Sequence, residues 1–150
     1  MQNMRTTGKK IKVVFLCTGN SCRSQMAEGF ANHYGADLLE ASAGISPQGI
    51  NPFTIMVMDE SGVDISAQTS DPINMNHFND ADLIITLCGD AQENCPLVPG
   101  KVEKRHWALP DPAKTAGDQE EVLKAFREVR DSISKLVNEL LDELQEGAVR

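Results

Sequence analysis

The sequence predicts an α/β fold of three layers, in which helices cover both faces of a four-stranded parallel sheet. Short apolar segments rich in β-branched residues alternate along the chain with segments of helical periodicity. Cysteines follow two of the apolar segments directly, at positions 17 and 88. Because ligands of parallel sheets bind beyond the carboxyl ends of the strands, we expect both cysteines to lie at one functional edge.

Four segments are expected to form the strands of this sheet, at 11–16, 38–43, 82–87 and 102–108. The first is a short β-branched run of the kind that is buried on both faces of a parallel sheet. Helices are expected at 23–33, at 51–60 behind an Asn-Pro pair, after the turn at 69–72, and from a capping box of Asp118 and Glu121 almost to the end. We expect the acidic outer face of this last helix to be solvated.

Length and charge limit the possible functions. The 150 residues suit one domain, which we assign to 11–150 behind a flexible leader at 1–10. A net charge of −8 argues against a nucleic-acid partner but allows a small anion that is held by a local field. The apolar run after the polar segment at 1–10 is interrupted by Lys12 and is too short for the core of a signal peptide or for a membrane span, so we expect a cytoplasmic protein without a membrane partner. We also expect a monomer.

The segment CTGNSCRS at 17–24, here called the oxyanion loop, joins the first strand to the first helix. Backbone N–H groups of such a loop, the positive end of the helix and the planar fork of Arg23 all favour a tetrahedral anion. The same field would keep Cys17 as the nucleophilic thiolate, with Ser24 as its hydrogen-bond donor. The alternative is a buried cysteine beside an arginine, but the intervening loop favours the functional interpretation. The residues expected to bind the oxyanion are Thr18, Gly19, Asn20, Ser21, Cys22, Arg23 and Ser24.

The remaining cysteines are interpreted from their spacing. Cys22 is interpreted as a small buried residue, since its side chain cannot easily share a pocket with Cys17. Six residues separate Cys88 from Cys95, and the chain has no close cysteine pair of the zinc-binding kind. Two unremarkable thiols are the alternative, but beside a nucleophilic thiol the pair favours a disulfide relay.

Asp111 stands between two prolines after the last expected strand and has few local partners. This position suits a general acid or base that faces the anion, although turn aspartates are common before proline. His106 and Trp107 are expected within the strand, with Trp107 in the core.

The oxyanion loop resembles that of the low-molecular-weight tyrosine phosphatase fold family and, more closely, that of the thioredoxin-coupled arsenate reductases within it. The resemblance continues at 42–45, 69–71, 86–88, 94–96, 106–107 and 111–112, and so covers nearly everything after the leader. The loop is shared with the phosphatases, whereas the pair of Cys88 and Cys95 indicates the reductases.

This resemblance implies reduction of arsenate to arsenite, an activity of arsenical resistance. Cys17 would attack arsenate, Asp111 would protonate the departing oxygen, and Cys88 would attack Cys17 and release arsenite. Cys95 would then attack Cys88, and reduced thioredoxin would open the resulting disulfide. No tightly bound cofactor is implied, although some members of the family hold a potassium ion. The residues at the matching positions are Asn20, Glu28, Ser42, Thr69 and Asp71.

The alternative function is hydrolysis of phosphate monoesters through a phosphocysteine at Cys17, since the loop would fit phosphate or sulfate as well as arsenate. The phosphatases follow the catalytic aspartate and proline with tyrosines, whereas Ala113 and Lys114 stand here and the only tyrosine is Tyr34. We therefore expect at most a weak phosphatase activity. A third alternative is a module that binds oxyanions or senses redox state without turnover.

Overall fold

The computed structural model describes residues 11–19, 21–35, 38–44, 48–89, 95, 100 and 102–148. A parallel sheet of four strands forms its centre, with the strand order β2-β1-β3-β4. The strands are β1 (Ile11–Cys17), β2 (Leu38–Gly44), β3 (Leu83–Thr86) and β4 (Glu103–His106). The predicted four-stranded parallel sheet is therefore confirmed. The predicted leader at 1–10 lies outside the described residues.

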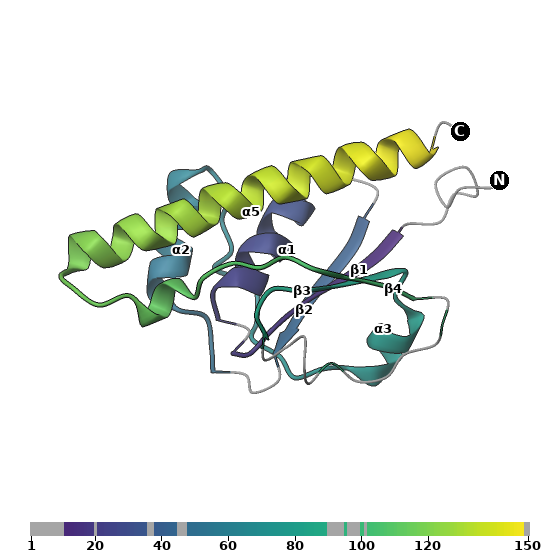
Figure 1. Ribbon diagram of the computed structural model, residues 1–150, viewed down its shortest axis with the longest axis horizontal. Helices are drawn as coiled ribbons and strands as arrows, with labels where there is room; N and C mark the ends of the chain where they lie inside the picture. The colour runs from purple at the N-terminus through teal and green to yellow at the C-terminus, as the bar shows by residue number, and fades with distance from the viewer. Residues whose placement is uncertain are drawn as a thin grey trace.

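Helices cover the sheet on both sides and complete the three predicted layers. They are α1 (Arg23–Tyr34), α2 (Pro52–Glu60), α3 (Met75–Asp80), α5 (Gln119–Ala148) and the short 3-10 helix η1 (Pro112–Lys114). Figure 1 shows α5 running along the length of the molecule over α1 and α2, while α3 lies on the opposite side of the sheet. No described helix is both long enough and apolar enough to cross a membrane.

The core forms between the apolar strands and the helices that pack around them. Phe15 and Leu16 in the central strand β1 are fully buried, as expected for a strand that is covered on both faces. On α5 the buried positions Phe126, Ile133 and Val137 keep helical spacing, and the helix packs against α1 and α2. Direct parallel pairing of β1 with β3 fixes the carboxyl ends of these strands relative to each other.

The predicted helix starts are present as hydrogen bonds. The Asn51 side chain accepts from the backbone N–H of Phe53 at 2.8 Å and so caps α2. At the start of α5, Asp118 Oδ1 accepts from the N–H of Glu121 at 3.0 Å, and Glu121 Oε1 accepts from the N–H of Asp118 at 3.5 Å. This reciprocal pair is the capping box that the sequence predicts.

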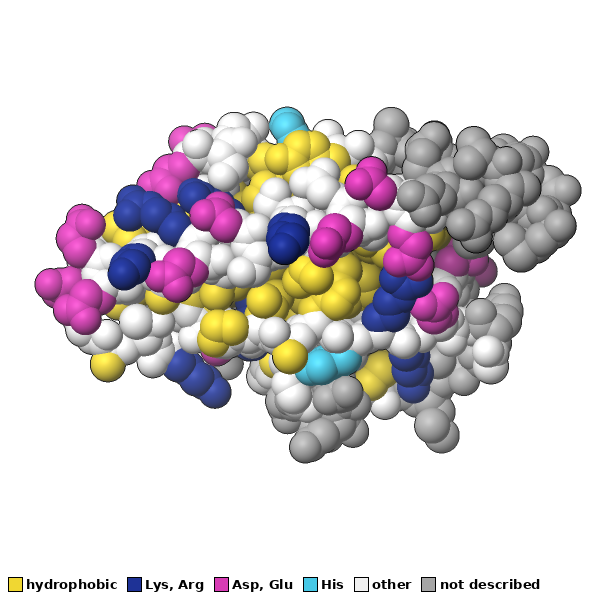
Figure 2. Space-filling view, turned by 45° about the horizontal axis from the view of Figure 1, so that its top comes forward, with side chains coloured by type: hydrophobic (Ala, Val, Ile, Leu, Met, Phe, Trp, Pro, Cys, Tyr) yellow, Lys and Arg dark blue, Asp and Glu magenta, His cyan; other side chains and the backbone are white. Residues whose placement is uncertain are grey.

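One detail of the prediction is wrong. The last strand ends at His106, so Trp107 lies beyond it, half-buried, with its ring 6.0 Å from that of Phe15. The acidic outer face of α5 is exposed as expected, and its Glu143 also accepts two hydrogen bonds from Arg105 of β4. Figure 2 shows this face, on which acidic and basic side chains alternate along the helix.

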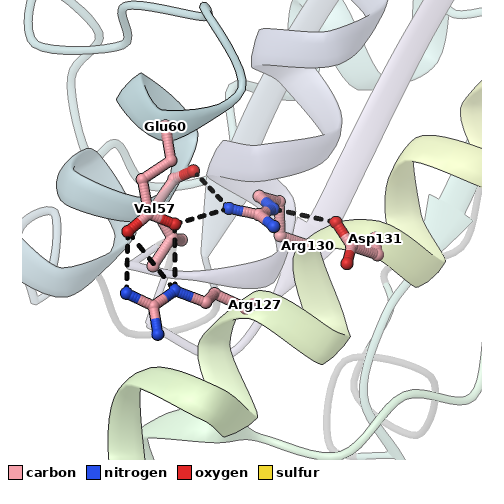
Figure 3. A network of polar contacts seen from close by, with 5 residues as sticks. All are labelled: Val57, Glu60, Arg127, Arg130 and Asp131. Atoms are coloured by element: carbon pink, nitrogen blue, oxygen red, sulfur yellow. Dashed lines mark hydrogen bonds and ion pairs between the residues drawn. The ribbon is translucent and has the colours of Figure 1, made fainter. Parts of the chain in front are cut away.

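A second ion-pair network joins α5 to α2. Glu60 of α2 lies between two arginines of α5, with Oε2 2.8 Å from Arg127 Nη2 and Oε1 2.8 Å from Arg130 Nη1 (Figure 3). Arg130 Nη1 also donates to the Val57 carbonyl at 2.9 Å. The hydrogen bond from Arg127 and then that from Arg130 lower the pKa of Glu60 to about 2. The network therefore holds a carboxylate that is more acidic than in the unfolded chain.

The substitution Glu60→Gln tests this network. Because the folded pKa lies below the ordinary value of 4.5, the stabilisation is complete above that value and is lost as the pH falls towards 2. We expect Glu60→Gln to lower the free energy of unfolding by about 0.5–1 kcal/mol at pH 7, since the pair is partly exposed. In urea unfolding the difference from wild type should shrink at pH 3. Glu139→Gln, at an exposed position of α5, is the matched control, and equal stability of both variants at pH 7 would contradict the account.

Candidate active site

A pocket of about 620 Å³ opens beyond the carboxyl ends of β1 and β3. It brings together Cys17, Cys88 and Asp111, which the sequence separates widely and which we expected at one edge of the sheet. Its described lining residues are Cys17, Thr18, Gly19, Ser21, Cys22, Arg23, Gln48, Asn51, Cys88, Gly89, Asp111, Ala113 and Lys114. Most of the oxyanion loop therefore lines the pocket, while Asn20 lies outside the described residues.

Cys17 is the last residue of β1, and only 3% of it is exposed. Its Sγ lies 2.9 Å from the Oγ of Ser24, a fully buried residue in the first turn of α1. A hydroxyl at this distance can donate to a thiolate and stabilise its charge. The arrangement places a thiol in the pocket with a buried hydroxyl as its hydrogen-bond partner.

Arg23 begins α1 and is buried in the wall of the pocket. Its Nη1 donates to the carbonyls of Leu109 at 2.9 Å and Leu87 at 3.3 Å, and its Nη2 lies 3.7 Å from Asp111 Oδ2. Its Nε is buried and has no hydrogen-bond partner among the described residues. A buried donor without a partner is costly, and an oxyanion in the pocket can provide the missing acceptor.

The outer side of the oxyanion loop is anchored by its carbonyl groups. The Gly19 carbonyl accepts from the Gln48 N–H at 2.9 Å and from Ser70 Oγ at 3.2 Å. The Ser70 hydroxyl also accepts from the Gly49 N–H at 3.1 Å, and the Ser21 carbonyl accepts from the Asn51 N–H at 3.1 Å. The C=O and N–H of one trans peptide lie in a plane and point in opposite directions. Hydrogen bonds to the carbonyl groups therefore also fix the direction of the N–H groups in the same peptides.

Cys22 is 5% exposed, as expected for a small buried residue, and burial raises the pKa of its thiol. The expectation that it cannot share a pocket with Cys17 is wrong, since both residues line the same pocket. The two thiols differ in their partners. Cys17 lies against Ser24, whereas Cys22 Sγ makes a long contact of 3.8 Å with Ser21 Oγ. Hydrogen bonding with Thr54 and Ser21 lowers the pKa of Cys22 but does not offset the rise that burial causes. Its raised pKa makes Cys22 a poor nucleophile at neutral pH.

Cys88 reaches the pocket from the end of β3, and its Sγ lies 3.1 Å from Thr18 Oγ1. The second thiol therefore contacts the residue next to Cys17. Cys95 lies elsewhere, half-buried against the core, and burial raises the pKa of its thiol while the charge of Lys104 opposes this rise. All four cysteines are free thiols. Neither Thr18 as a partner of Cys88 nor Lys104 as a neighbour of Cys95 could be found from sequence spacing.

Asp111 has more partners than the sequence suggests. Its Oδ1 accepts from the Ala113 N–H at 3.0 Å and caps η1, while Oδ2 lies near Arg23. The expectation of few local partners is therefore wrong. The carboxyl still lines the pocket, where it can exchange a proton with a bound ligand.

Four of the five residues considered for potassium form two oxygen pairs, while the fifth, Asn20, lies outside the described residues. Ser42 donates to Glu28, and Thr69 Oγ1 donates to Asp71 Oδ2 at 2.6 Å. The Gly44 N–H donates to the Asp71 carbonyl at 2.9 Å, which joins the end of β2 to the turn at 69–71. Such oxygen ligands suit a hard cation. Within the described part of the chain, no three His, Cys, Asp or Glu side chains form a metal-binding group, and potassium stays a prediction.

Comparisons with known proteins agree with this geometry. The family model for low molecular weight phosphotyrosine protein phosphatases matches residues 12–150. An arsenate reductase of Shouchella clausii is 50% identical over 135 residues, which are 89% of this chain and 96% of that protein.

Two solved structures extend the comparison. One, an arsenate reductase in the phosphate binding state, has a TM-score of 0.73 at 37% identity and covers 89% of this chain and 98% of its own. The other, a thioredoxin-dependent arsenate reductase of Corynebacterium glutamicum, has a TM-score of 0.75 at 26% identity and covers 94% of this chain and 65% of its own.

The substitution Ser70→Ala tests the outer anchor of the oxyanion loop. It removes one of two hydrogen bonds to the Gly19 carbonyl and the acceptor of the Gly49 N–H, without touching the pocket lining. We expect binding of inorganic phosphate to weaken about three- to tenfold, the equivalent of one or two neutral hydrogen bonds. Ser66→Ala, at an exposed position, is the matched control. Unchanged phosphate affinity in Ser70→Ala, measured by calorimetry, would contradict this role.

Proposed function

The chain belongs to the low molecular weight phosphotyrosine protein phosphatase family, and we propose that it reduces arsenate to arsenite through a relay of three cysteines. The observation that carries the proposal is the position of Cys88. A phosphatase needs one reactive thiol, and Cys22 lines the pocket as well. Here a further pocket thiol, that of Cys88, lies against Thr18, the residue next to Cys17. That position suits attack on the sulfur of Cys17.

In the first step, the Cys17 thiolate attacks the arsenic atom and one arsenate oxygen departs. Asp111 gives the departing oxygen a proton, so that it leaves as water and a sulfur–arsenic bond remains. Ser24 stabilises the thiolate before the attack, and Arg23 neutralises charge on the oxygens. The oxidation state of arsenic does not change in this step.

In the second step, the Cys88 thiolate attacks Cys17 Sγ. The electron pair of the sulfur–arsenic bond passes to arsenic, which leaves as arsenite, while the two cysteines become a disulfide. Two thiols are thus oxidised while arsenic is reduced by two electrons, so the step balances. The contact between Thr18 and Cys88 supports this order, because it holds the attacking sulfur beside the oxyanion loop.

In the third step, Cys95 attacks Cys88 and releases Cys17 for another cycle. Cys17 and Cys88 are 3% and 8% exposed, whereas Cys95 is half-buried and lies outside the pocket lining. The relay therefore moves the disulfide from buried to more accessible sulfur, where reduced thioredoxin can attack it. Since burial raises the pKa of Cys95, this step should accelerate as the pH rises towards that pKa.

We further propose that the protein works in the cytoplasm as a monomer, where thioredoxin supplies the electrons. Potassium at Asn20 and at the oxygen pairs of Glu28 with Ser42 and Thr69 with Asp71 remains part of the proposal. The ion would act on the fold around the oxyanion loop rather than on the relay, since neither pair lines the pocket.

Phosphatase activity is the second candidate, because the oxyanion loop can hold phosphate as well as arsenate. Against it, no aromatic side chain is present among the described lining residues. Tyr34 sits at the end of α1, where its ring stacks on Phe30 at 5.8 Å. An aryl phosphate would therefore find no ring to stack on in the described lining, and we expect only weak hydrolysis of phosphate monoesters.

The relay is tested by coupling arsenite formation to NADPH oxidation with thioredoxin and thioredoxin reductase. Wild type should turn over continuously. Cys95→Ser should release about one arsenite per protein and then stop, because the Cys17–Cys88 disulfide is not passed on. Cys22→Ser, which replaces another buried thiol, is the matched control and should keep more than about a tenth of the activity, since a raised pKa makes this thiol a poor nucleophile.

Two outcomes would overturn the proposal. Continuous turnover by Cys95→Ser would exclude the third cysteine from the relay. Phosphate monoester hydrolysis that is unchanged in Cys88→Ser, without arsenate-dependent NADPH oxidation in wild type, would favour the phosphatase. Arsenate binding without any turnover would instead indicate a binding module.

A further inference from the structure

One cationic side chain of the pocket lining is not paired with a carboxylate. The protein has a net charge of −8, so its overall field repels anions. The described lining includes the basic residues Arg23 and Lys114 and the acidic residue Asp111, beside Cys17, which is proposed to react as a thiolate. Arg23 and Asp111 lie 3.7 Å apart and largely cancel each other at a distance. Lys114 therefore supplies the positive charge that opposes the overall field at the described pocket.

The backbone of Lys114 is fixed relative to Asp111. Both belong to one short turn, in which Asp111 caps η1 and the Lys114 N–H donates to the Asp111 carbonyl at 3.2 Å. Pro112 between them is buried, and η1 packs against α5. The turn thus directs its acid towards Arg23 and places its lysine on the exposed side of the pocket lining.

The ammonium group of Lys114 is available for a ligand. The side chain is exposed, and none of the ion pairs found among the described residues includes it. Arg23 differs in each respect, because it is buried and donates to two carbonyls. A hydrated ammonium on a flexible stem suits attraction of an anion, whereas a fixed guanidinium suits its orientation.

We propose that Lys114 is a specificity-determining residue that draws doubly charged inorganic oxyanions into the pocket against the repulsion of the acidic protein. The inference rests on the proposed reduction of arsenate and gives a reason why the substrate enters the pocket and the product leaves it. Arsenate enters as an anion, whereas arsenite is a neutral acid at physiological pH. Lys114 therefore attracts the substrate without retaining the product.

The position of Lys114 also favours one class of substrate over another. In this turn the residues after the aspartate and proline are a small Ala113 and the cationic Lys114, both of which line the pocket. Neither offers a ring for an aryl group, while the lysine favours a small ion with charge on all sides. The same turn therefore disfavours an aromatic ester and favours a free oxyanion.

Binding of inorganic phosphate to the reduced protein tests the proposal without requiring turnover. We expect Lys114→Gln to raise the Kd of phosphate about three- to tenfold at low salt, Lys114→Glu to raise it further, and Lys114→Arg to stay near wild type. The difference between Lys114→Gln and wild type should shrink towards zero at about 0.5 M salt, because an exposed charge is screened. In arsenate reduction the same variant should raise KM by a similar factor and leave kcat unchanged.

Lys124→Gln is the matched control, since it removes one exposed positive charge from α5 outside the pocket lining. It should leave the phosphate Kd within about twofold of wild type, because Lys124 does not line the pocket. Equal phosphate affinity of Lys114→Gln and wild type at low salt would overturn the proposal, as would a loss that salt does not diminish. Failure of arsenate reduction with these phosphate results intact would refute the proposed function and leave the role of Lys114 standing.

Discussion

The buried guanidinium of Arg23 is the interaction on which the rest of the pocket depends. Its hydrogen bonds reach the carbonyl of Leu87, immediately before Cys88, and the carbonyl of Leu109, shortly before Asp111. A single side chain at the start of α1 thus joins three loops that follow three strands. Hydrogen bonds from a charged donor contribute about 1.5–3 kcal/mol each, so these contacts also offset part of the cost of burying the charge. Arg23 therefore holds the oxyanion loop, Cys88 and Asp111 in defined positions relative to one another.

The four thiols are distinguished by their surroundings rather than by their residue type. Cys17 has a buried hydroxyl at 2.9 Å and Cys88 a hydroxyl at 3.1 Å, whereas burial dominates around Cys22 and raises its pKa. Cys95 is the most accessible of the four and lies away from the pocket lining. Such an order suits a relay that begins on a protected sulfur and ends on a reachable one.

The sequence predicted the parts that depend on local pattern. The buried run of β1, the capping box of Asp118 and Glu121 and the apolar stripe of α5 each follow from periodicity or from short spacing, and the structure contains all of them. The convergence of Cys17 with Cys88 followed from the geometry of parallel strands.

The contacts that assemble the site could not be predicted in the same way. Arg23 bonds to backbone carbonyls 64 and 86 residues away, and Ser70 bonds to the Gly19 carbonyl 51 residues away. Carbonyl groups carry no sequence signature, so such bonds become visible only once the fold is known. The shared pocket of Cys22 and Cys17 was missed for the same reason, because it depends on the path of the loop.

The central claim is that oxidation passes from Cys17 through Cys88 to Cys95. It is tested most directly by adding one equivalent of arsenate to the fully reduced wild-type protein without thioredoxin, alkylating the remaining thiols in acid-quenched samples and mapping the disulfides by mass spectrometry. The account predicts one arsenite per protein, a disulfide between Cys88 and Cys95, and an alkylated Cys17. Arsenite release with Cys88 and Cys95 both alkylated, or no arsenite at all, would contradict it.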